Sequence, residues 1–246
     1  ENIGVVDPSE AAQSAARASG LIRIAESATD ADLSADLIVL AVKPQITDIA
    51  LSPLAHRVSS TATVLSIIAG INSASLANLL GLPNDDAVVR SMPNTPALVG
   101  EGMTGLFSNS DQRAHGRILA ERVMSAVGQC VWVSNESDLD LVTAISGSGP
   151  AYFFLFMESL ADAAVELGMS PQTAHQLSVQ TALGAAKLAQ ASDDGLAKLR
   201  ENVTSPGGTT EQAIESFEAS ELRAIVMSAT RAAKKRSIEL SEEFGL

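Results

Sequence analysis

The chain has 246 residues, of which 46% are hydrophobic and only 3% aromatic, so it can form one large or two ordinary domains with an aliphatic core. Its 16 Lys and Arg face 29 Asp and Glu, and the net charge of −13 argues against nucleic acid and anionic membranes as partners. The single Cys130 excludes an intrachain disulfide. We expect no signal peptide and no uninterrupted apolar stretch long enough to span a membrane, and these features together are typical of a cytoplasmic protein.

The first half of the chain alternates short apolar runs with helical patterns. We expect strands at Ile3–Val6, Leu21–Ile24, Leu37–Val42, Thr63–Ile68, Ala87–Arg90, Gly102–Phe107 and Gln129–Val133. We expect helical segments at Glu10–Ala18, Gln45–Val58, Ser73–Leu80 and Gln112–Ala126. Such alternation is typical of a parallel sheet with right-handed crossovers. Because Leu37–Val42 is apolar throughout, it predicts a central strand covered on both faces.

From about Asn135 onward, strand signals end and helical patterns continue. We expect helices at Asp138–Ile145, Ala151–Leu167, Pro171–Ala191 and Glu221–Phe244. The segment Ala151–Leu167 is apolar nearly all round, which is typical of a helix buried in a large body or against another chain. We therefore predict an α/β domain at residues 1–133 and an all-α dimerisation domain at residues 134–246.

The front of the chain is similar to the second strand of a nucleotide-binding sheet. Such a sheet normally begins with a strand and a Gly-x-Gly-x-x-Gly turn that cradles the pyrophosphate. The chain opens at Glu1–Ser9 without this turn, so we expect the first strand, glycine loop and helix to be missing, which would weaken cofactor binding. Asp7 ends the strand where a ribose hydroxyl is usually held, and its charge disfavours a 2′-phosphate. Alternatively, Asp7 caps the following helix, with Pro8 in its first turn, and both roles can hold together.

A glycine loop at Asn202–Thr210 separates two helical runs near the C-terminus. Its Pro-Gly-Gly triplet ends any preceding helix, and Thr209 and Thr210 open an amphipathic segment. A helix N-terminus offers free amides and a partial positive charge, which suit a small carboxylate. Glycines allow close approach to the backbone, and threonine hydroxyls orient a ligand. The alternative is a plain helix cap without a ligand.

Four further motifs occur in order with this loop. They are Ala41-Val42-Lys43-Pro44, Ala69-Gly70, Met92-Pro93-Asn94-Thr95-Pro96 and Ser146-Gly147-Ser148-Gly149-Pro150-Ala151-Tyr152. With Asn202–Thr210 and the downstream Ala213, Ile214 and Phe217, they closely resemble pyrroline-5-carboxylate reductase over essentially the whole chain. The resemblance implies a Rossmann-type N-terminal domain whose first βα unit is missing, followed by an all-α domain that interlocks with a second copy. In many members of that family, five dimers form a decamer.

The resemblance also implies a reaction and a substrate site. Such enzymes pass a hydride from NADPH or NADH to the C=N carbon of 1-pyrroline-5-carboxylate, giving L-proline in the last step of proline biosynthesis. The residues implied to bind the substrate are Asp193, Ser205, Gly207, Gly208, Thr209 and Thr210. The amides of Thr209 and Thr210 would hold the carboxylate, and the Thr210 hydroxyl, as the catalytic group, would bond the ring nitrogen. Asp193 stands where some relatives carry the longer Glu.

The cofactor residues combine strand ends with the resemblance. Ligands of open α/β sheets collect at the C-terminal ends of the strands. The predicted set is Asp7, Ala41, Val42, Lys43, Pro44, Ile67, Ile68, Ala69, Asn94, Thr95, Glu136 and Asn202. The resemblance places Glu136 and Asn202 on the nicotinamide side. Alternatively, Lys43 is a solvated loop cation and Asn94-Thr95-Pro96 a plain turn. Asp7 favours NADH or dual use, whereas Ser9 leaves NADPH open.

Other sites and functional classes are less well matched. The three histidines, His56, His115 and His175, show no metal-ligand spacing, so no metal site is expected. A β-hydroxyacid dehydrogenase-like enzyme would share the plan, but no lysine stands at a suitable position in the helical half. An inactive oligomerising scaffold derived from a reductase is the non-catalytic alternative.

Overall fold

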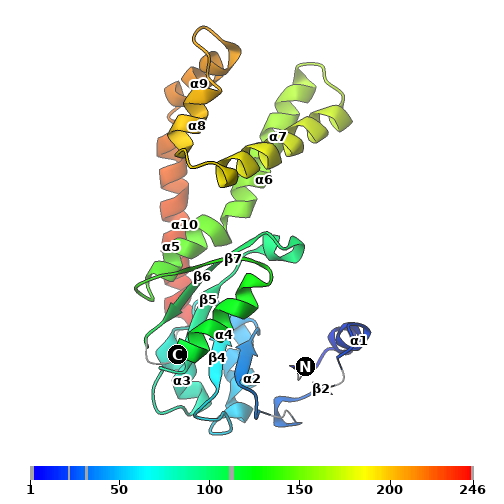
Figure 1. Cartoon of the computed structure of the whole chain (residues 1–246), viewed down its shortest axis with the longest axis vertical. Helices are drawn as coiled ribbons and strands as arrows, with labels where there is room; N and C mark the ends of the chain where they lie inside the picture. The colour runs from blue at the N-terminus through cyan, green and yellow to red at the C-terminus, as the bar shows by residue number, and fades with distance from the viewer. Residues whose placement is uncertain (1–2, 22, 31–32, 111–113, 245–246) are drawn as a thin grey trace. The chain divides into compact units, whose positions relative to one another are not determined.

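The computed structural model of the chain describes residues 3–21, 23–30, 33–110 and 114–244 (Figure 1). Residues 1–2, 22 and 112–113 fall within predicted segments and lie outside the described part. Two compact units are present. The sheet unit comprises Glu1–Gly147 with Lys234–Leu246, and the helical unit comprises Ser148–Ala233. The domain division between residues 133 and 134 stays a prediction, since these units are defined by packing alone.

In the described part of the sheet unit, strands form two separate sheets. In the smaller sheet, β1 (Gly4–Val6) pairs in parallel with β2 (Arg23–Ala25). The five-stranded sheet has the order β3-β4-β5-β6-β7, with bounds Leu37–Leu40, Thr63–Ser66, Val88–Met92, Gly102–Ser108 and Gly128–Trp132. The predicted parallel pairing is confirmed for β3, β4 and β5. Strand β6 is antiparallel to β5 and parallel to β7, so the last two strands run opposite to the first three.

The central strand covered on both faces is β4, not β3. All four β4 residues are buried; Val64 lies in one hydrophobic cluster and Leu65 in another, as expected for side chains that alternate across a sheet. Among the described residues, β3 pairs with β4 alone, and Val39 is 47% exposed. The prediction of a central strand at Leu37–Val42 is therefore wrong. Apolar composition indicates how the faces of a strand are covered, but it does not report neighbours at the edges.

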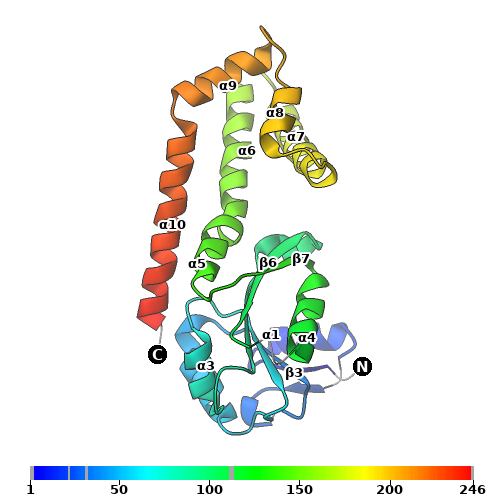
Figure 2. The ribbon, with the colours of Figure 1, turned by 60° about the vertical axis from the view of Figure 1, so that its left-hand side comes forward.

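Helices cover both faces of the five-stranded sheet (Figures 1 and 2). The helical segments before β7 are α1 (Glu10–Ala18), η1 (Ala28–Asp30), η2 (Pro44–Ile46), α2 (Thr47–Leu51), η3 (Ser52–Leu54), α3 (Ser73–Leu80), η4 (Thr95–Val99) and α4 (Ala114–Ser125). Residues of α2, η3 and α3 pack with Val64 and Val88, whereas Ala120 and Met124 of α4 pack with the opposite cluster. The helix predicted at Gln45–Val58 is broken into short segments: Pro44 begins one 3₁₀ turn, and Pro53 is the second residue of another, Ser52–Leu54.

The rest of the described chain is helical. Its segments are α5 (Asp138–Val142), a π-helical turn (Thr143–Gly147), α6 (Gly149–Glu166), α7 (Pro171–Ala191), α8 (Leu196–Asn202), α9 (Thr209–Ala219) and α10 (Leu222–Phe244). Helices α6 and α7 form a hairpin: Ser170 caps α7 by accepting from the Thr173 amide at 3.2 Å, and Ser178 donates to the Met157 carbonyl at 2.6 Å. Helix α8 was not predicted, because seven residues carry little periodic signal.

Apolar side chains of α6 remain exposed in the single chain. Phe153, Phe154 and Leu155 are each more than 60% exposed, and Phe156 contacts Phe217 with ring centroids 6.1 Å apart. By length and composition alone, the run Asp138–Glu166 could cross a membrane, a test that the core helix of a soluble protein also passes; the run is interrupted by charged residues such as Glu158 and Asp162. An apolar face of this size on a described surface marks an interaction site.

Candidate active site

The C-terminal ends of β3 and β4 lie side by side and bring two predicted cofactor motifs together. The Ile67 amide donates to the Leu40 carbonyl at 3.0 Å, so the Ala41–Pro44 segment and the Ile67–Ala69 turn continue the same parallel pair. Ala41, Lys43 and Ala69 are exposed, whereas Ile68 is 2% exposed and belongs to the core. The side chain of Ile68 therefore packs in the core, and a ligand can contact this turn through its backbone.

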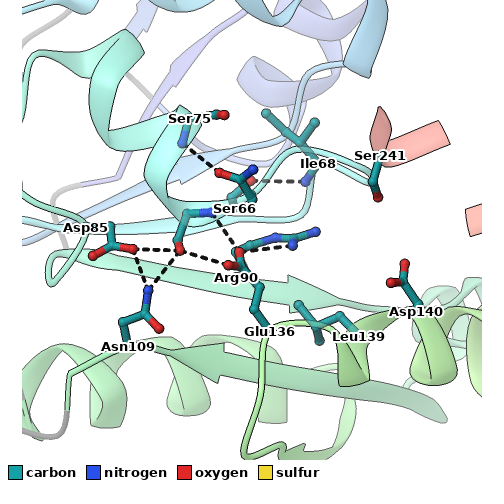
Figure 3. Close-up of polar contacts among 12 residues, drawn as sticks. Ser66, Ile68, Ser75, Asp85, Arg90, Asn109, Glu136, Leu139, Asp140 and Ser241 are labelled. Atoms are coloured by element: carbon teal, nitrogen blue, oxygen red, sulfur yellow. Dashed lines mark hydrogen bonds and ion pairs between the residues drawn. The ribbon is translucent and has the colours of Figure 1, made fainter. Parts of the chain in front are cut away.

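Two buried serines fix the Ile67–Ala69 turn, and the sequence analysis missed both. The Ile68 amide donates to Ser66 Oγ at 3.2 Å (Figure 3). Ser91 Oγ donates to the Ser66 carbonyl at 3.0 Å. Both hydroxyls are buried, so each hydrogen bond also satisfies a polar group in the core. The signal that could have found them is a serine at the end or in the middle of an otherwise apolar strand.

Asn94 clamps three segments at the end of β5. Its Nδ2 donates to the Ser146 carbonyl at 3.0 Å, and its Oδ1 accepts from the Met103 amide at 2.9 Å. Both ends of the side-chain amide are thus engaged within the sheet unit, while the neighbouring Thr95 is exposed. The interpretation of Asn94-Thr95-Pro96 as a plain turn is incomplete, because Asn94 joins the β5 end to β6 and to the π-helical turn.

Glu136 lies in a polar network rather than free at the strand ends. Its Oε1 accepts from the Ser73 amide at 2.7 Å and from Arg90 Nη1 at 3.1 Å, and its Oε2 accepts from Ser73 Oγ at 3.2 Å (Figure 3). Asp85 accepts from Ser73 Oγ at 2.9 Å and from Asn109. The carboxylate therefore caps α3 and balances a guanidinium that is only 13% exposed. Its predicted place beside the nicotinamide stays a prediction.

Asp7 ends β1 as predicted, but Ser9 caps α1. The Ser9 hydroxyl accepts from the Ala12 amide at 3.4 Å, and Asp7 Oδ1 accepts from the Ser9 amide at 2.8 Å. The alternative in which Asp7 itself caps the helix is therefore wrong, because the helix starts three residues after it. Asp7 and the Ile67–Ala69 turn belong to different sheets.

The letters Gly-x-Gly-x-x-Gly do occur in the chain, at Gly100, Gly102 and Gly105. There they open strand β6 instead of joining a strand to a helix. A Cβ on Gly102 would lie 2.8 Å from the Val127 carbonyl, and one on Gly105 would lie 2.7 Å from Val142. These glycines permit close packing and do not form a phosphate cradle.

The glycine loop of the helical unit brings together most of the predicted substrate residues. Gly207 has φ +70°, and a Cβ there would meet no atom within 4 Å, so the loop faces open space. Gly208 is the N-cap of α9, and Thr209 and Thr210 are its first two residues. The first amides of a helix lack intrahelical acceptors, so the Thr209 and Thr210 amides can bind a carboxylate.

The neighbouring side chains complete the description of this loop. Ser205 is exposed, and its carbonyl accepts from the Gly208 amide at 2.9 Å; the Gly207 amide donates to Glu211 Oε2 at 2.7 Å. Asn202 ends α8 and is exposed. Asp193 precedes α8 at its other end, so the length of that helix, roughly 10 Å, separates it from the loop in a single copy. The geometry of one copy gives no support to the Asp193 contact.

Helices α8 and α9 also enclose a shallow pocket of about 330 Å³, lined by Arg200, Glu201, Thr204, Ile214 and Glu218. Arg223 donates to both oxygens of Glu218 at 2.7 to 3.0 Å, and this hydrogen bonding lowers the pKa of the exposed Glu218 carboxyl below its usual value. The pair keeps the wall of the pocket charged at neutral pH. Among the described residues, no group of three His, Cys, Asp or Glu side chains could hold a metal ion.

Comparison with known proteins identifies the family. The family model for pyrroline-5-carboxylate reductase dimerisation matches residues 136–240. A pyrroline-5-carboxylate reductase from Pseudomonas aeruginosa is 47% identical over 224 residues, which is 91% of this chain and 81% of that protein. The chain belongs to the pyrroline-5-carboxylate reductase family. The predicted resemblance is thereby confirmed.

Solved structures of the family agree with the fold. The pyrroline-5-carboxylate reductase of Coxiella burnetii is 38% identical with a TM-score of 0.87, covering 96% of this chain and 87% of that one. The Plasmodium falciparum pyrroline carboxylate reductase, solved with NADP bound, is 34% identical with a TM-score of 0.78, covering 89% and 82%. The predicted Rossmann-type sheet followed by a helical dimerisation region is confirmed, and the chain is a member of an enzyme family. The β-hydroxyacid dehydrogenase-like and scaffold alternatives are not favoured.

Proposed function

We propose that this chain reduces 1-pyrroline-5-carboxylate to L-proline by hydride transfer from NADPH or NADH, the last step of proline biosynthesis. The observation that carries the proposal is the loop before α9, in which Gly207 lies in open space and Thr209 and Thr210 occupy the first turn. This arrangement offers backbone amides for a carboxylate and a hydroxyl within reach of a ring nitrogen beside it.

In the proposed mechanism, the Thr209 and Thr210 amides hold the substrate carboxylate. The Thr210 hydroxyl donates to the imine nitrogen and passes it a proton, which water replaces, as the neighbouring carbon gains the hydride. When bound, the dihydronicotinamide supplies that hydride. The chain contributes orientation and polarity, and positioning alone can supply roughly 7–11 kcal/mol in ideal cases. Ser205 lines the same site in this proposal, and Asp193 is a further proposed substrate contact.

The proposed cofactor site uses the ends of β3 and β4. Ala41 and Lys43 are exposed there, where a nucleotide can contact them, while Ile67–Ala69 forms the adjacent turn. In the proposal, Val42 and Pro44 shape the segment Ala41–Pro44 after β3. Thr95 lines the nicotinamide end of the site, and Asn94 holds the segments around it. Glu136 and Asn202 approach the nicotinamide. These residues fit a dinucleotide because ligands of open α/β sheets collect at these strand ends.

Asp7 sets an expectation for cofactor choice. Its carboxylate at the end of β1 suits the two ribose hydroxyls of NADH and repels the 2′-phosphate of NADPH. We expect the kcat/KM for NADPH to exceed that for NADH by no more than about tenfold. Steady-state kinetics with each cofactor measure the ratio, and a value well above ten would show that Asp7 does not govern the choice.

The proposed assembly is a homodimer formed through the helical unit. We further propose that five such dimers can form a decamer. A cytoplasmic location fits a single cysteine and an acidic surface. Support for the dimer comes from the family model and from the exposed side chains of α6.

Replacing Phe153 with glutamate should dissociate the assembly. Phe153 is 69% exposed in the single chain, and a charge at the core of an apolar interface remains unpaired when buried. We expect light scattering to give a mass of two or more chains for the unchanged protein, and a monomer for Phe153→Glu at micromolar concentration. Leu98→Glu is the matched control, because Leu98 is 90% exposed but lies outside the dimerisation match. A monomeric unchanged chain would contradict the proposed dimer.

The assay for the proposed function uses two forms of the protein. Among the described strands, β1 pairs only with β2, and β3 only with β4, so each leaves backbone groups to which another strand can bond. The chain is therefore assayed as printed and also extended at its N-terminus by a Rossmann first strand and glycine loop. We expect NADPH or NADH oxidation with L-1-pyrroline-5-carboxylate, and no reduction of NADP⁺ or NAD⁺ with 3-hydroxy acids. The reverse pattern would assign the chain to hydroxyacid oxidation.

A further inference from the structure

The turn after β4 lies directly against the last helix. Gly70 closes this turn with φ +79°, and a Cβ built on it would lie 3.3 Å from the Leu240 carbonyl oxygen and 3.5 Å from Ser241 Cα. This contact joins backbone to backbone, so a flexible side chain cannot relieve it. Glycine suits the position because its φ is left-handed and because a methyl group would press on α10.

Two further contacts hold the end of α10 on the sheet unit. Ser237 Oγ donates to Asp140 Oδ1 at 2.7 Å, and Phe244 packs against the core cluster that contains Ile68 and Ile71 (Figure 3 shows Ile68, Asp140 and Ser241). Residues from 234 onward accordingly belong to the sheet unit. The end of α10 is thus anchored at a hydrogen bond, at the Gly70 contact and in the core.

The opposite side of the turn is held by the strands. Ser66 Oγ accepts from the Ile68 amide, and the Leu40 carbonyl accepts from the Ile67 amide. The Ile67–Ala69 backbone is therefore set between the β3–β4 pair on one side and α10 on the other. Ile68 is fixed in the core, and Gly70 touches α10. A shift of α10 therefore moves Gly70 and, with it, the adjacent exposed Ala69.

We propose that the end of α10 positions the Ile67–Ala69 turn for the cofactor, with Gly70, Ser237 and Phe244 as positioning residues. The proposal rests on the cofactor role assigned to this turn in the proposed function. It predicts that disturbing the α10 contact weakens cofactor binding and leaves substrate binding at the α9 loop unchanged. A contact that served stability alone would lower the amount of folded protein without changing the ratio of the two KM values.

Gly70→Ala is the test, with Gly20→Ala as its matched control. Gly20 has φ +84°, and a Cβ there meets no atom within 4 Å, so both variants carry the same backbone strain and only one presses on α10. In the more active of the two forms, we expect Gly70→Ala to raise the KM for NADPH about tenfold, with the KM for pyrroline-5-carboxylate within about twofold. Gly20→Ala should change neither KM.

Direct binding separates this proposal from the proposed function. Titration of NADPH by its own fluorescence gives a Kd without turnover, so a chain that binds NADPH but reduces no substrate would refute the function and still test the positioning. Equal Kd values for Gly70→Ala and Gly20→Ala would overturn the proposal. If Gly70→Ala does not fold, two other tests decide. Ser237→Ala removes only the hydrogen bond to Asp140 and must raise the NADPH Kd. The NADPH Kd of Phe244→Leu, which keeps an apolar side chain, must lie closer to that of the unchanged protein than the Kd of Phe244→Ala does. Failure of that order would also overturn it.

Discussion

Thr210→Ala should lower kcat for pyrroline-5-carboxylate reduction by about 100-fold or more, the usual range for losing a group that transfers a proton. The free energy of unfolding should stay within about 1 kcal/mol. The two effects separate because Gly208 is the N-cap of α9 and no side chain caps this helix, so the hydroxyl of Thr210 is not what starts it. Steady-state kinetics and denaturant unfolding of the same preparation measure both quantities.

Two variants control this prediction. Thr210→Ser keeps a hydroxyl and should retain most of the activity, whereas Thr209→Ala keeps both backbone amides and should affect kcat much less than Thr210→Ala. Equal activity in Thr210→Ala and the unchanged protein would remove Thr210 from the mechanism. The carboxylate site would then be the only role left for this loop.

Glu136→Ala should strongly lower the stability of the sheet unit. The substitution leaves the Arg90 guanidinium, 13% exposed, without its carboxylate and removes the acceptor of the Ser73 amide. Breaking a buried pair costs about 3–5 kcal/mol, and we expect about 3 because Glu136 is 26% exposed. Denaturant unfolding monitored through the single Trp132 measures the loss.

The matched control is Glu218→Ala in the helical unit. Glu218 also pairs with an arginine, Arg223, at 2.7 Å, but both side chains are well exposed. Exposed pairs contribute about 0–1 kcal/mol, so this variant should unfold close to the unchanged protein. A Glu136→Ala protein no less stable than Glu218→Ala would show that the network around Ser73 does not hold the sheet unit together.

The elements that the sequence predicted correctly are those with a strong local signal. Helices α3 and α7 have the predicted bounds, because Asn72 and Ser170 are good caps and each helix carries a clear period. Strand order depends on pairing between distant segments, and local pattern says nothing about it. For that reason Leu37–Val42 was predicted to be a central strand, whereas β3 lies at the edge of the described five-stranded sheet and its neighbour β4 is the strand buried throughout.

The candidate site shows the same division. Sequence motifs predicted a substrate site at the α9 loop and a cofactor site at the ends of β3 and β4, because glycine turns and strand ends can be recognised from short stretches of sequence. The partners of Glu136 could not be foreseen, since Ser73 and Arg90 lie 63 and 46 residues away along the chain. The contact of Gly70 with α10 was equally hidden, because its partners, Leu240 and Ser241, lie far from it along the chain.

The most direct test of the whole account is the stoichiometry of the reaction. L-1-Pyrroline-5-carboxylate is incubated with NADPH or NADH and the chain, as printed and in the extended form, and both cofactor oxidation and L-proline formation are measured. The account predicts one L-proline for each cofactor oxidised in at least the extended form. Folded protein that forms no L-proline in either form would contradict the reductase function and leave an oligomeric scaffold.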